Sequence, residues 1–178
     1  ILKKTLRNDK IAASKEIIYN WMNSNTNHIW HLEMASTQDT VIRKNLIDHL
    51  ATHVDSIGFN ERELIDLLEV MDEDELAKKC EENTNSVNLF EGMLKIFEYS
   101  NCPRIQLHMF DLYIKLQQKE FKITPEQNLQ GMQLAAVITA TKEGTGAIES
   151  PKALTWANPK FAKQIETYQM SGVESRKK

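Results

Sequence analysis

Apolar side chains return every three or four residues along most of the chain, which is the period of an amphipathic helix. On residues 37–57 this stripe consists of Ile42, Leu46, Leu50, Val54 and Ile57. The other helices predicted from the same spacing span residues 9–23, 61–71, 87–99, 103–120, 125–141 and 159–170. Short helical turns are expected at 73–82 and 151–157. No alternating run bounded by hairpin turns stands out, so we predict no strands.

Helix-start signals support this interpretation. Pro125 follows Thr124, with Gln127 three residues after the threonine, and Asn60 precedes Glu63 by the same interval. Both patterns are typical of a capping box, and proline suits the first helical position. Gly58 is expected to end the helix over 37–57 in the left-handed conformation. The predicted fold class is therefore all-α, an irregular bundle of about eight to nine helices in one compact domain.

The expected domain covers residues 1–172. Within it, residues 141–150 (TKEGTGAIES) contain two glycines and no apolar period. We interpret this stretch as a mobile surface loop. Residues 173–178 form a basic tail.

Composition restricts the class of protein only broadly. The 178 residues are 41% hydrophobic and 26% charged, with a formal net charge of -3. No apolar run approaches the roughly 18–20 residues of a membrane span. The two cysteines, Cys80 and Cys102, do not suggest a disulfide framework. We therefore expect reduced thiols in an intracellular protein, cytoplasmic or nuclear, without a membrane partner.

The charges are polarised along the chain. Residues 61–82 contain ten acidic and three basic side chains, a net charge of -7, which leaves +4 for the remainder. A solvated face that only keeps the protein in solution is one interpretation. The other is an acidic helical face that binds a basic partner. The candidate partner-binding residues are Glu63, Asp66, Glu69, Asp72, Glu73, Asp74 and Glu75.

The basic ends suggest an alternative function. A helical, nucleocapsid-like domain could contact phosphates with Lys3, Lys4, Arg7 and Lys10, giving salt-sensitive binding. Trp21 lies near this cluster but falls in line with Ile17, which favours a place in the core.

Two histidine pairs raise the question of a metal site. They are His28 with His31, and His49 with His53. Residues four apart share a helix face, but zinc needs three or four ligands. Neither His-Glu-x-x-His nor Cys-x-x-Cys occurs. A core Trp30 flanked by histidines explains the first pair better, so metal binding is a distant alternative and we predict neither metal nor cofactor.

No local motif indicates catalysis. There is no Gly-x-Ser-x-Gly elbow, and Gly144 and Gly146 lack the lysine of a phosphate-binding loop. Cys102 and His108 lie six apart with no local sign of a base. We therefore expect no enzyme but a protein-interaction or scaffold module. A protein partner is predicted, with nucleic acid and association of copies as open alternatives.

Overall fold

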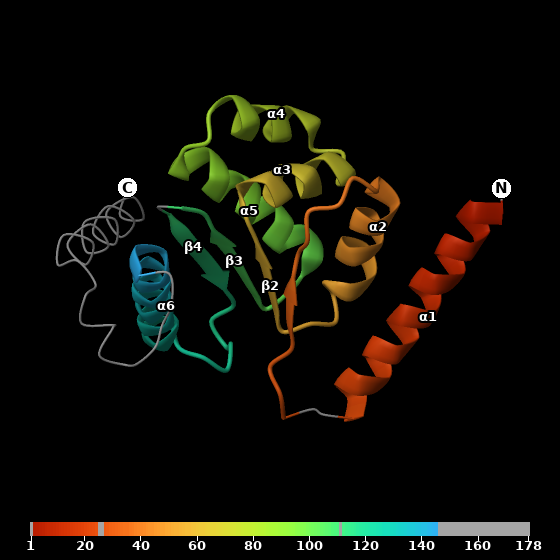
Figure 1. Ribbon diagram of the computed structural model, residues 1–178, viewed down its shortest axis with the longest axis horizontal. Coiled ribbons are helices and arrows are strands. Elements are labelled where there is room, and N and C mark those ends of the chain that lie inside the picture. The colour runs from red at the N-terminus through yellow and green to blue at the C-terminus, as the bar shows by residue number, and fades with distance from the viewer. Residues whose placement is uncertain (1, 25–26, 111, 146–178) are drawn as a thin grey trace. The chain divides into compact units, whose positions relative to one another are not determined.

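The part of the chain that the structure describes contains a four-stranded mixed sheet (Figure 1). The computed structural model describes residues 2–24, 27–110 and 112–145. The described elements are, in order, α1 (Leu2–Ser24), β1 (His31–Glu33), α2 (Thr40–Asn45), the π-helical turn η1 (Leu46–Leu50), β2 (Ser56–Phe59), α3 (Glu61–Val70), α4 (Asp74–Glu82), α5 (Ser86–Ser100), β3 (Arg104–His108), β4 (Tyr113–Gln117) and α6 (Pro125–Thr145). The all-α prediction is therefore wrong. The chain divides into two compact units, Ile1–Phe121 and Lys122–Lys178.

The strands follow the order β1-β2-β3-β4. The first three are parallel, and β4 runs antiparallel to β3. Parallel neighbours need a crossover, which α2 and η1 supply between β1 and β2, and which α3, α4 and α5 supply between β2 and β3. The carboxyl ends of β1, β2 and β3 consequently meet at one edge of the sheet.

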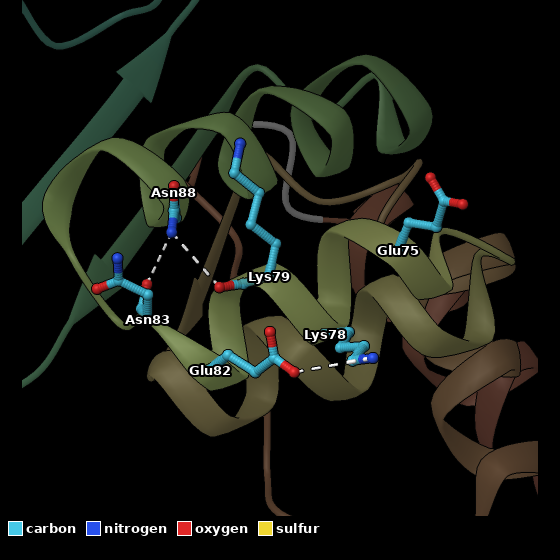
Figure 2. Close-up of a pocket in the computed structure, with 6 residues that line it drawn as sticks. All are labelled: Glu75, Lys78, Lys79, Glu82, Asn83 and Asn88. Atoms are coloured by element: carbon cyan, nitrogen blue, oxygen red, sulfur yellow. Dashed lines mark hydrogen bonds and ion pairs between the residues drawn. The ribbon is translucent and has the colours of Figure 1, made fainter.

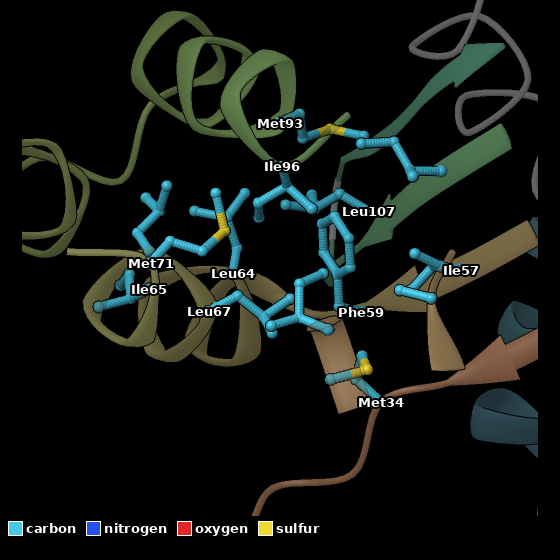
Figure 3. Close-up of a cluster of buried hydrophobic side chains, with 14 of the residues drawn as sticks. Met34, Ile57, Phe59, Leu64, Ile65, Leu67, Met71, Met93, Ile96 and Leu107 are labelled. Atoms are coloured by element: carbon cyan, nitrogen blue, oxygen red, sulfur yellow. The ribbon is translucent and has the colours of Figure 1, made fainter. Parts of the chain in front are cut away.

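Side chains alternate between the two faces of the sheet. One face is apolar and carries Leu32, Ile57, Phe59, Ile105, Leu107, Ile114 and Leu116. Helix α3 packs against β2 and β3, α5 packs against β3 and β4, and α4 packs on both helices. Phe59 and Leu107 meet Leu64, Met93 and Ile96 in the resulting core (Figure 3). The opposite face of the sheet is polar.

The helix predicted over 103–120 is wrong, because this stretch forms the hairpin of β3 and β4. Ile105, Met109, Leu112 and Leu116 fall near a helical spacing by coincidence. The buried residues of β3 are Ile105 and Leu107, which alternate with half-buried polar residues. The period is therefore two, as expected for a strand with one covered face.

The helix predicted over 37–57 is helical only over residues 40–50, so its predicted end is wrong. Asp39 caps α2 by accepting hydrogen bonds from Val41 N at 3.0 Å and Ile42 N at 3.3 Å. The helical backbone ends with η1 at Leu50, and the chain then enters β2. Gly58 is part of that strand and does not end a helix.

Other helix starts are confirmed. Asn60 and Glu63 form the predicted capping box of α3. In the second unit, Gln127 N donates to Thr124 Oγ1 at 3.2 Å and Thr124 N donates to Gln127 Oε1 at 3.0 Å. Helix α6 extends to Thr145, so residues 141–145 of the expected loop are its last turn.

Several expectations fall outside the described residues: the rest of that loop, the helices at 151–157 and 159–170, and the tail at 173–178. Among the described helices, none combines the length and apolar content needed to cross a membrane.

Candidate functional site

The polar face of the sheet brings together residues from three distant segments. The register aligns His31 with Ser56, Glu33 with Gly58, and Gly58 with Gln106. Because paired residues point to the same side, polar residues of β1, β2 and β3 share one face. Strand by strand, these residues are His31, Glu33, Ser56, Gly58, Arg104, Gln106 and His108.

Glu33 is the centre of this polar face. His31 Nε2 lies 2.8 Å from Glu33 Oε2, and His108 Nε2 lies 3.5 Å from Glu33 Oε1. The Glu33 side chain is 49% exposed, and His31 and His108 are 32% and 42% exposed. The carboxylate is thus flanked by one imidazole at each oxygen and remains open to a ligand.

Gly58 makes room for this arrangement. A Cβ atom at position 58 would lie 2.1 Å from Glu33 Oε2 and 2.9 Å from His31 Nε2. No side chain fits there without displacing the carboxylate. Glycine within a strand often marks such a close approach, and here it is the approach of Glu33 to the backbone that requires it.

Glu63 lies just beyond the carboxyl end of β2. Its Oε2 accepts a hydrogen bond from Asn60 N at 3.0 Å, and its Oε1 accepts one from Ser36 Oγ at 3.0 Å. Glu63 is only 7% exposed. Ser36 follows β1, so this contact joins the segments after two neighbouring parallel strands.

Positive charge accompanies these groups on the polar face. Lys115 of β4 pairs with Gln106 in the antiparallel register. Burial, followed by repulsion from the positive charge of Arg104, lowers the pKa of Lys115 to about 8. Arg104 is itself half-buried, with its guanidinium 5.0 Å from the ring centre of Phe121.

This arrangement suits a polar, phosphorylated ligand. In open sheets with parallel strands, ligands bind beyond the carboxyl ends of the strands. Glu33 offers oxygen ligands to a hard cation, and the imidazoles offer hydrogen-bond donors. Within residues 2–24, 27–110 and 112–145, no group of three or more His, Cys, Asp or Glu side chains is placed to hold a metal ion unaided.

The predicted acidic face is largely occupied by internal contacts. Glu63 caps α3, and Asp66 is 4% exposed. Arg43 contacts Asp66 at 2.6 Å and Glu69 at 3.8 Å. Glu63 and Asp66 are therefore buried in internal contacts, whereas Glu69 is 43% exposed, so the three acids do not form one solvated stripe.

The remaining acids of that set lie around the start of α4. Asp72 has a positive φ of 62°, and Glu73 lies 3.4 Å from Lys95. Asp74 and Glu75 occupy the first turn of α4, where the helix dipole favours negative charge. The assignment of these seven acids to a binding surface stays a prediction that these contacts do not test.

The basic candidates all lie on α1. Lys10 is exposed, whereas the side chains of Lys3, Lys4 and Arg7 are outside the described part of the chain. Trp21, expected in the core, is 59% exposed, and Ile17 is 51% exposed. The prediction for Trp21 is wrong.

The two histidine pairs do not come together at one metal site among the described residues. His53 stacks near Tyr19 with ring centres 4.5 Å apart, and His53 Nδ1 lies 3.0 Å from the carbonyl oxygen of His49. His28 lies near Trp30, which packs, partly buried, against the core as expected. His31 instead contacts Glu33, which the sequence did not indicate as a site residue.

A separate surface depression of about 440 Å³ lies between α4 and the start of α5 (Figure 2). Its lining is Glu75, Lys78, Lys79, Glu82, Asn83 and Asn88. Asn88 Nδ2 donates to the Asn83 carbonyl at 2.8 Å and the Lys79 carbonyl at 3.4 Å (Figure 2). Lys78 lies 3.8 Å from Glu82. These contacts stabilise the α4–α5 connection, and we assign the depression no chemistry.

Sequence reasoning missed Glu33, Ser56, Arg104 and His108 as site residues. One signal was present for the last two, since polar and apolar residues alternate strictly from Arg104 to His108. Strand pairing then places them beside β1 and β2, and pairing is not written in local spacing.

The comparison with known proteins is specific. A family model described as "ADP-specific Phosphofructokinase/Glucokinase conserved region" matches residues 2–177. The ADP-dependent glucose/glucosamine kinase of Pyrococcus abyssi is 33% identical over 121 residues, covering 67% of this chain and 25% of that protein. An ADP-specific phosphofructokinase of Pyrococcus furiosus is 24% identical over 122 residues, covering 68% of this chain and 27% of that protein. The chain thus spans about a quarter of the length of these relatives.

A solved structure has the same fold. It is described as an ADP-dependent kinase complex with fructose-6-phosphate and ADPbetaS. It superposes with a TM-score of 0.80 at 22% identity, covering 94% of this chain and 38% of that one. The described α/β architecture is therefore that of an ADP-dependent kinase.

These matches overturn four expectations from the sequence. The non-enzymatic scaffold and the absence of an enzyme rested on missing local motifs. The macromolecular partner and the nucleic-acid-binding alternative rested on the distribution of charge along the chain. The family model extends over residues 2–177, so the likeness is not confined to one short motif. The chain belongs to the ADP-specific phosphofructokinase/glucokinase family.

Proposed function

We propose that this chain forms part of a kinase that transfers a phosphoryl group from ADP to a hexose or hexose phosphate. The observation that carries the proposal is the Glu33 carboxylate, held between His31 and His108 beside the carboxyl ends of three parallel strands. The family match over residues 2–177 supplies the class of reaction.

In this proposal Glu33 faces the nucleotide phosphates. ADP reacts as its magnesium complex, and Mg²⁺ is usually bound by one or two carboxylates together with substrate phosphates. Glu33 fits this need, because its negatively charged carboxylate is half-exposed. It lies at the edge of the sheet where the carboxyl ends of β1, β2 and β3 meet, which we call the ligand edge. Bound Mg²⁺ would neutralise charge on the phosphates. Glu63 is the second oxygen donor near this edge, although hydrogen bonds from Asn60 and Ser36 already occupy it.

In this mechanism the protein side chains orient the Glu33 carboxylate and offset the negative charge of the phosphates. His31 and His108 hold the Glu33 carboxylate in one orientation, so little reorganisation is needed when the nucleotide binds. The positive charges of Arg104 and Lys115 on the same face favour a phosphorylated ligand electrostatically.

The acceptor is proposed to be a neutral hexose in the first place. The match to the glucose/glucosamine kinase, at 33% identity, is stronger than the 24% match to the phosphofructokinase. The partners of the chain are then small molecules. An intracellular location, cytoplasmic in particular, is part of the same proposal, because both cysteines are buried free thiols.

The test is phosphoryl transfer from ADP to glucose by the natural full-length protein, with the variants Glu33→Gln and Glu91→Gln. The two glutamates are matched, since both side chains are about half exposed and each contacts a basic group. We expect Glu33→Gln to lower kcat/KM on the order of 100-fold, while Glu91→Gln retains the wild-type value. Equal activity of the two variants would remove Glu33 from the proposed site.

A further inference from the structure

A chain of hydrogen bonds leads from β3 to Glu33. Arg104 Nε donates to Ser56 Oγ at 2.9 Å. Ser56 Oγ lies 2.9 Å from His31 Nδ1, and His31 Nε2 lies 2.8 Å from Glu33 Oε2. Ser56 is completely buried, so these partners define its environment.

The donor of each hydrogen bond in this series can be assigned by elimination. The hydroxyl of Ser56 accepts from Arg104 and keeps one hydrogen to donate. Glu33, as a carboxylate, can only accept, so the nitrogen facing it must carry a proton. A neutral imidazole has one protonated nitrogen, and this places the proton of His31 on Nε2. Nδ1 is then the acceptor for the Ser56 hydroxyl.

Every bond in the series therefore runs in one direction, from Arg104 through Ser56 and His31 to Glu33. Arg104 has little freedom to leave this position, because its guanidinium also stacks over the ring of Phe121 at 5.0 Å. Reversing the His31–Ser56 bond in the neutral ring would leave an unprotonated Nε2 against a carboxylate. Such an arrangement repels, so the Glu33 carboxylate at Nε2 and the Ser56 hydroxyl at Nδ1 both favour the same tautomer.

We propose that Ser56 and Arg104 are positioning residues that fix the tautomer of His31 and, through it, the orientation of the Glu33 carboxylate. Their effect on catalysis rests on the proposed function, but their effect on His31 does not. A buried partner that orients an imidazole is the same device that supports metal-binding and catalytic histidines elsewhere.

The direct test is side-chain ¹⁵N NMR of the chain labelled at its five histidines, at a pH where the ring of His31 is neutral. The variant His31→Gln assigns the resonance. In the wild-type chain we expect a protonated Nε2 and an unprotonated Nδ1 at His31. Ser56→Ala removes the donor to Nδ1 and should shift the population toward the Nδ1–H tautomer.

Two further variants, a second perturbation and a control, show whether a shift in the His31 tautomer is due to Ser56. Arg104→Met leaves the Ser56 hydroxyl in place but frees it to turn, so we expect a smaller shift in the same direction. It also provides the answer if Ser56→Ala does not fold. Ser100→Ala is the matched control, since Ser100 is equally buried and its hydroxyl accepts only from Cys102 N among the contacts described. It should leave the His31 tautomer unchanged.

A proton on Nδ1 of His31 in the wild-type chain would overturn the proposal. So would a tautomer that Ser56→Ala and Arg104→Met leave unaltered, or one that Ser100→Ala shifts equally. Calorimetric titration with ADP and Mg²⁺ then separates the two ideas. If the variants shift the tautomer and weaken binding about 10-fold, both stand. If the tautomer shifts but the wild-type protein does not bind the nucleotide, the positioning role stands and the proposed function fails.

Discussion

The guanidinium of Arg43 on α2 lies 2.6 Å from the carboxylate of Asp66 on α3, and both side chains are less than a tenth exposed. Arg62 lies 2.9 Å from the other oxygen of the same carboxylate. Asp66 is one helical turn after Glu63, so this buried pair holds α2 against the helix whose first turn borders the proposed site.

Removing one partner of this pair should strongly destabilise the fold. Arg43→Met leaves Asp66 as a buried charge with only Arg62 beside it, and we expect the free energy of unfolding to fall by about 3 kcal/mol. The exposed pair Lys79–Glu91 has the same 2.6 Å separation with both side chains half exposed. Lys79→Met should cost less than about 1 kcal/mol. Urea denaturation measures both, and equal losses would contradict the importance of burial.

Gly58→Ala should damage ligand binding more than stability. The new methyl group would meet the flexible end of Glu33, which can move aside, but the His31–Glu33 hydrogen bond would break. We expect nucleotide affinity to fall about 10-fold or more. Gly131→Ala in α6 is the control, because nothing lies within 4 Å of its added Cβ atom. That variant should gain about 0.5–1 kcal/mol of helix stability and bind as before.

Two helix caps of the same type should differ in their effect on binding. Asn60→Ala and Asn85→Ala each remove side-chain hydrogen bonds to the first turn of a helix, α3 and α5 respectively, and each should cost about 1 kcal/mol. Of the two, only the Asn60 side chain accepts from the backbone N–H of Glu63, so its loss should loosen the helical turn that carries the Glu63 carboxylate beside the proposed site. Thermal unfolding should show similar losses, whereas calorimetry should show weaker ADP binding for Asn60→Ala alone. Weaker binding of both variants would indicate a general effect of stability.

The stability of the chain should depend on the protonation of Lys115. Burial, with the charge of Arg104, lowers its pKa from 10.5 to about 8, so between these values the unfolded chain binds a proton that the folded chain does not. The free energy of unfolding should therefore rise with pH across this window. Lys115→Met should remove the rise and stabilise the chain by about 1 kcal/mol at pH 7, after allowance for solvent screening.

Denaturation profiles from pH 7 to about pH 11 measure this effect. Lys95→Met is the control, because Lys95 is half exposed and lies 3.4 Å from Glu73. Its profile should keep the wild-type slope. A Lys115→Met profile that also keeps the slope would show that Lys115 is not responsible.

The sequence predicts helices here better than strands. The capping boxes of Asn60 with Glu63 and of Thr124 with Gln127 locate the starts of α3 and α6, because the signal and the structure are both local. Strand β1 has three residues and β2 is buried at all four positions, so neither shows a measurable alternation. Short buried strands of parallel sheets lack a period of two.

The candidate site was even less accessible to sequence reasoning. The sequence analysis considered His31 as a metal ligand together with His28, and it predicted that Gly58 ends a helix. Their common role follows from the pairing of β1 with β2, which aligns Glu33 with Gly58. Since that pairing joins segments about 25 residues apart, no local pattern contains it.

Because the sheet has one apolar and one polar face, neighbouring residues of a strand should tolerate substitution differently. Along β3, Ile105 and Leu107 are needed for folding, whereas their immediate neighbours Gln106 and His108 face the proposed ligand. A saturation mutagenesis survey can score cellular abundance and enzymatic activity separately. Along β3, substitutions should lower abundance at one position and activity at the next, in alternation. Adjacent codons would be under different selection, one for persistence of the protein and the next for its chemistry.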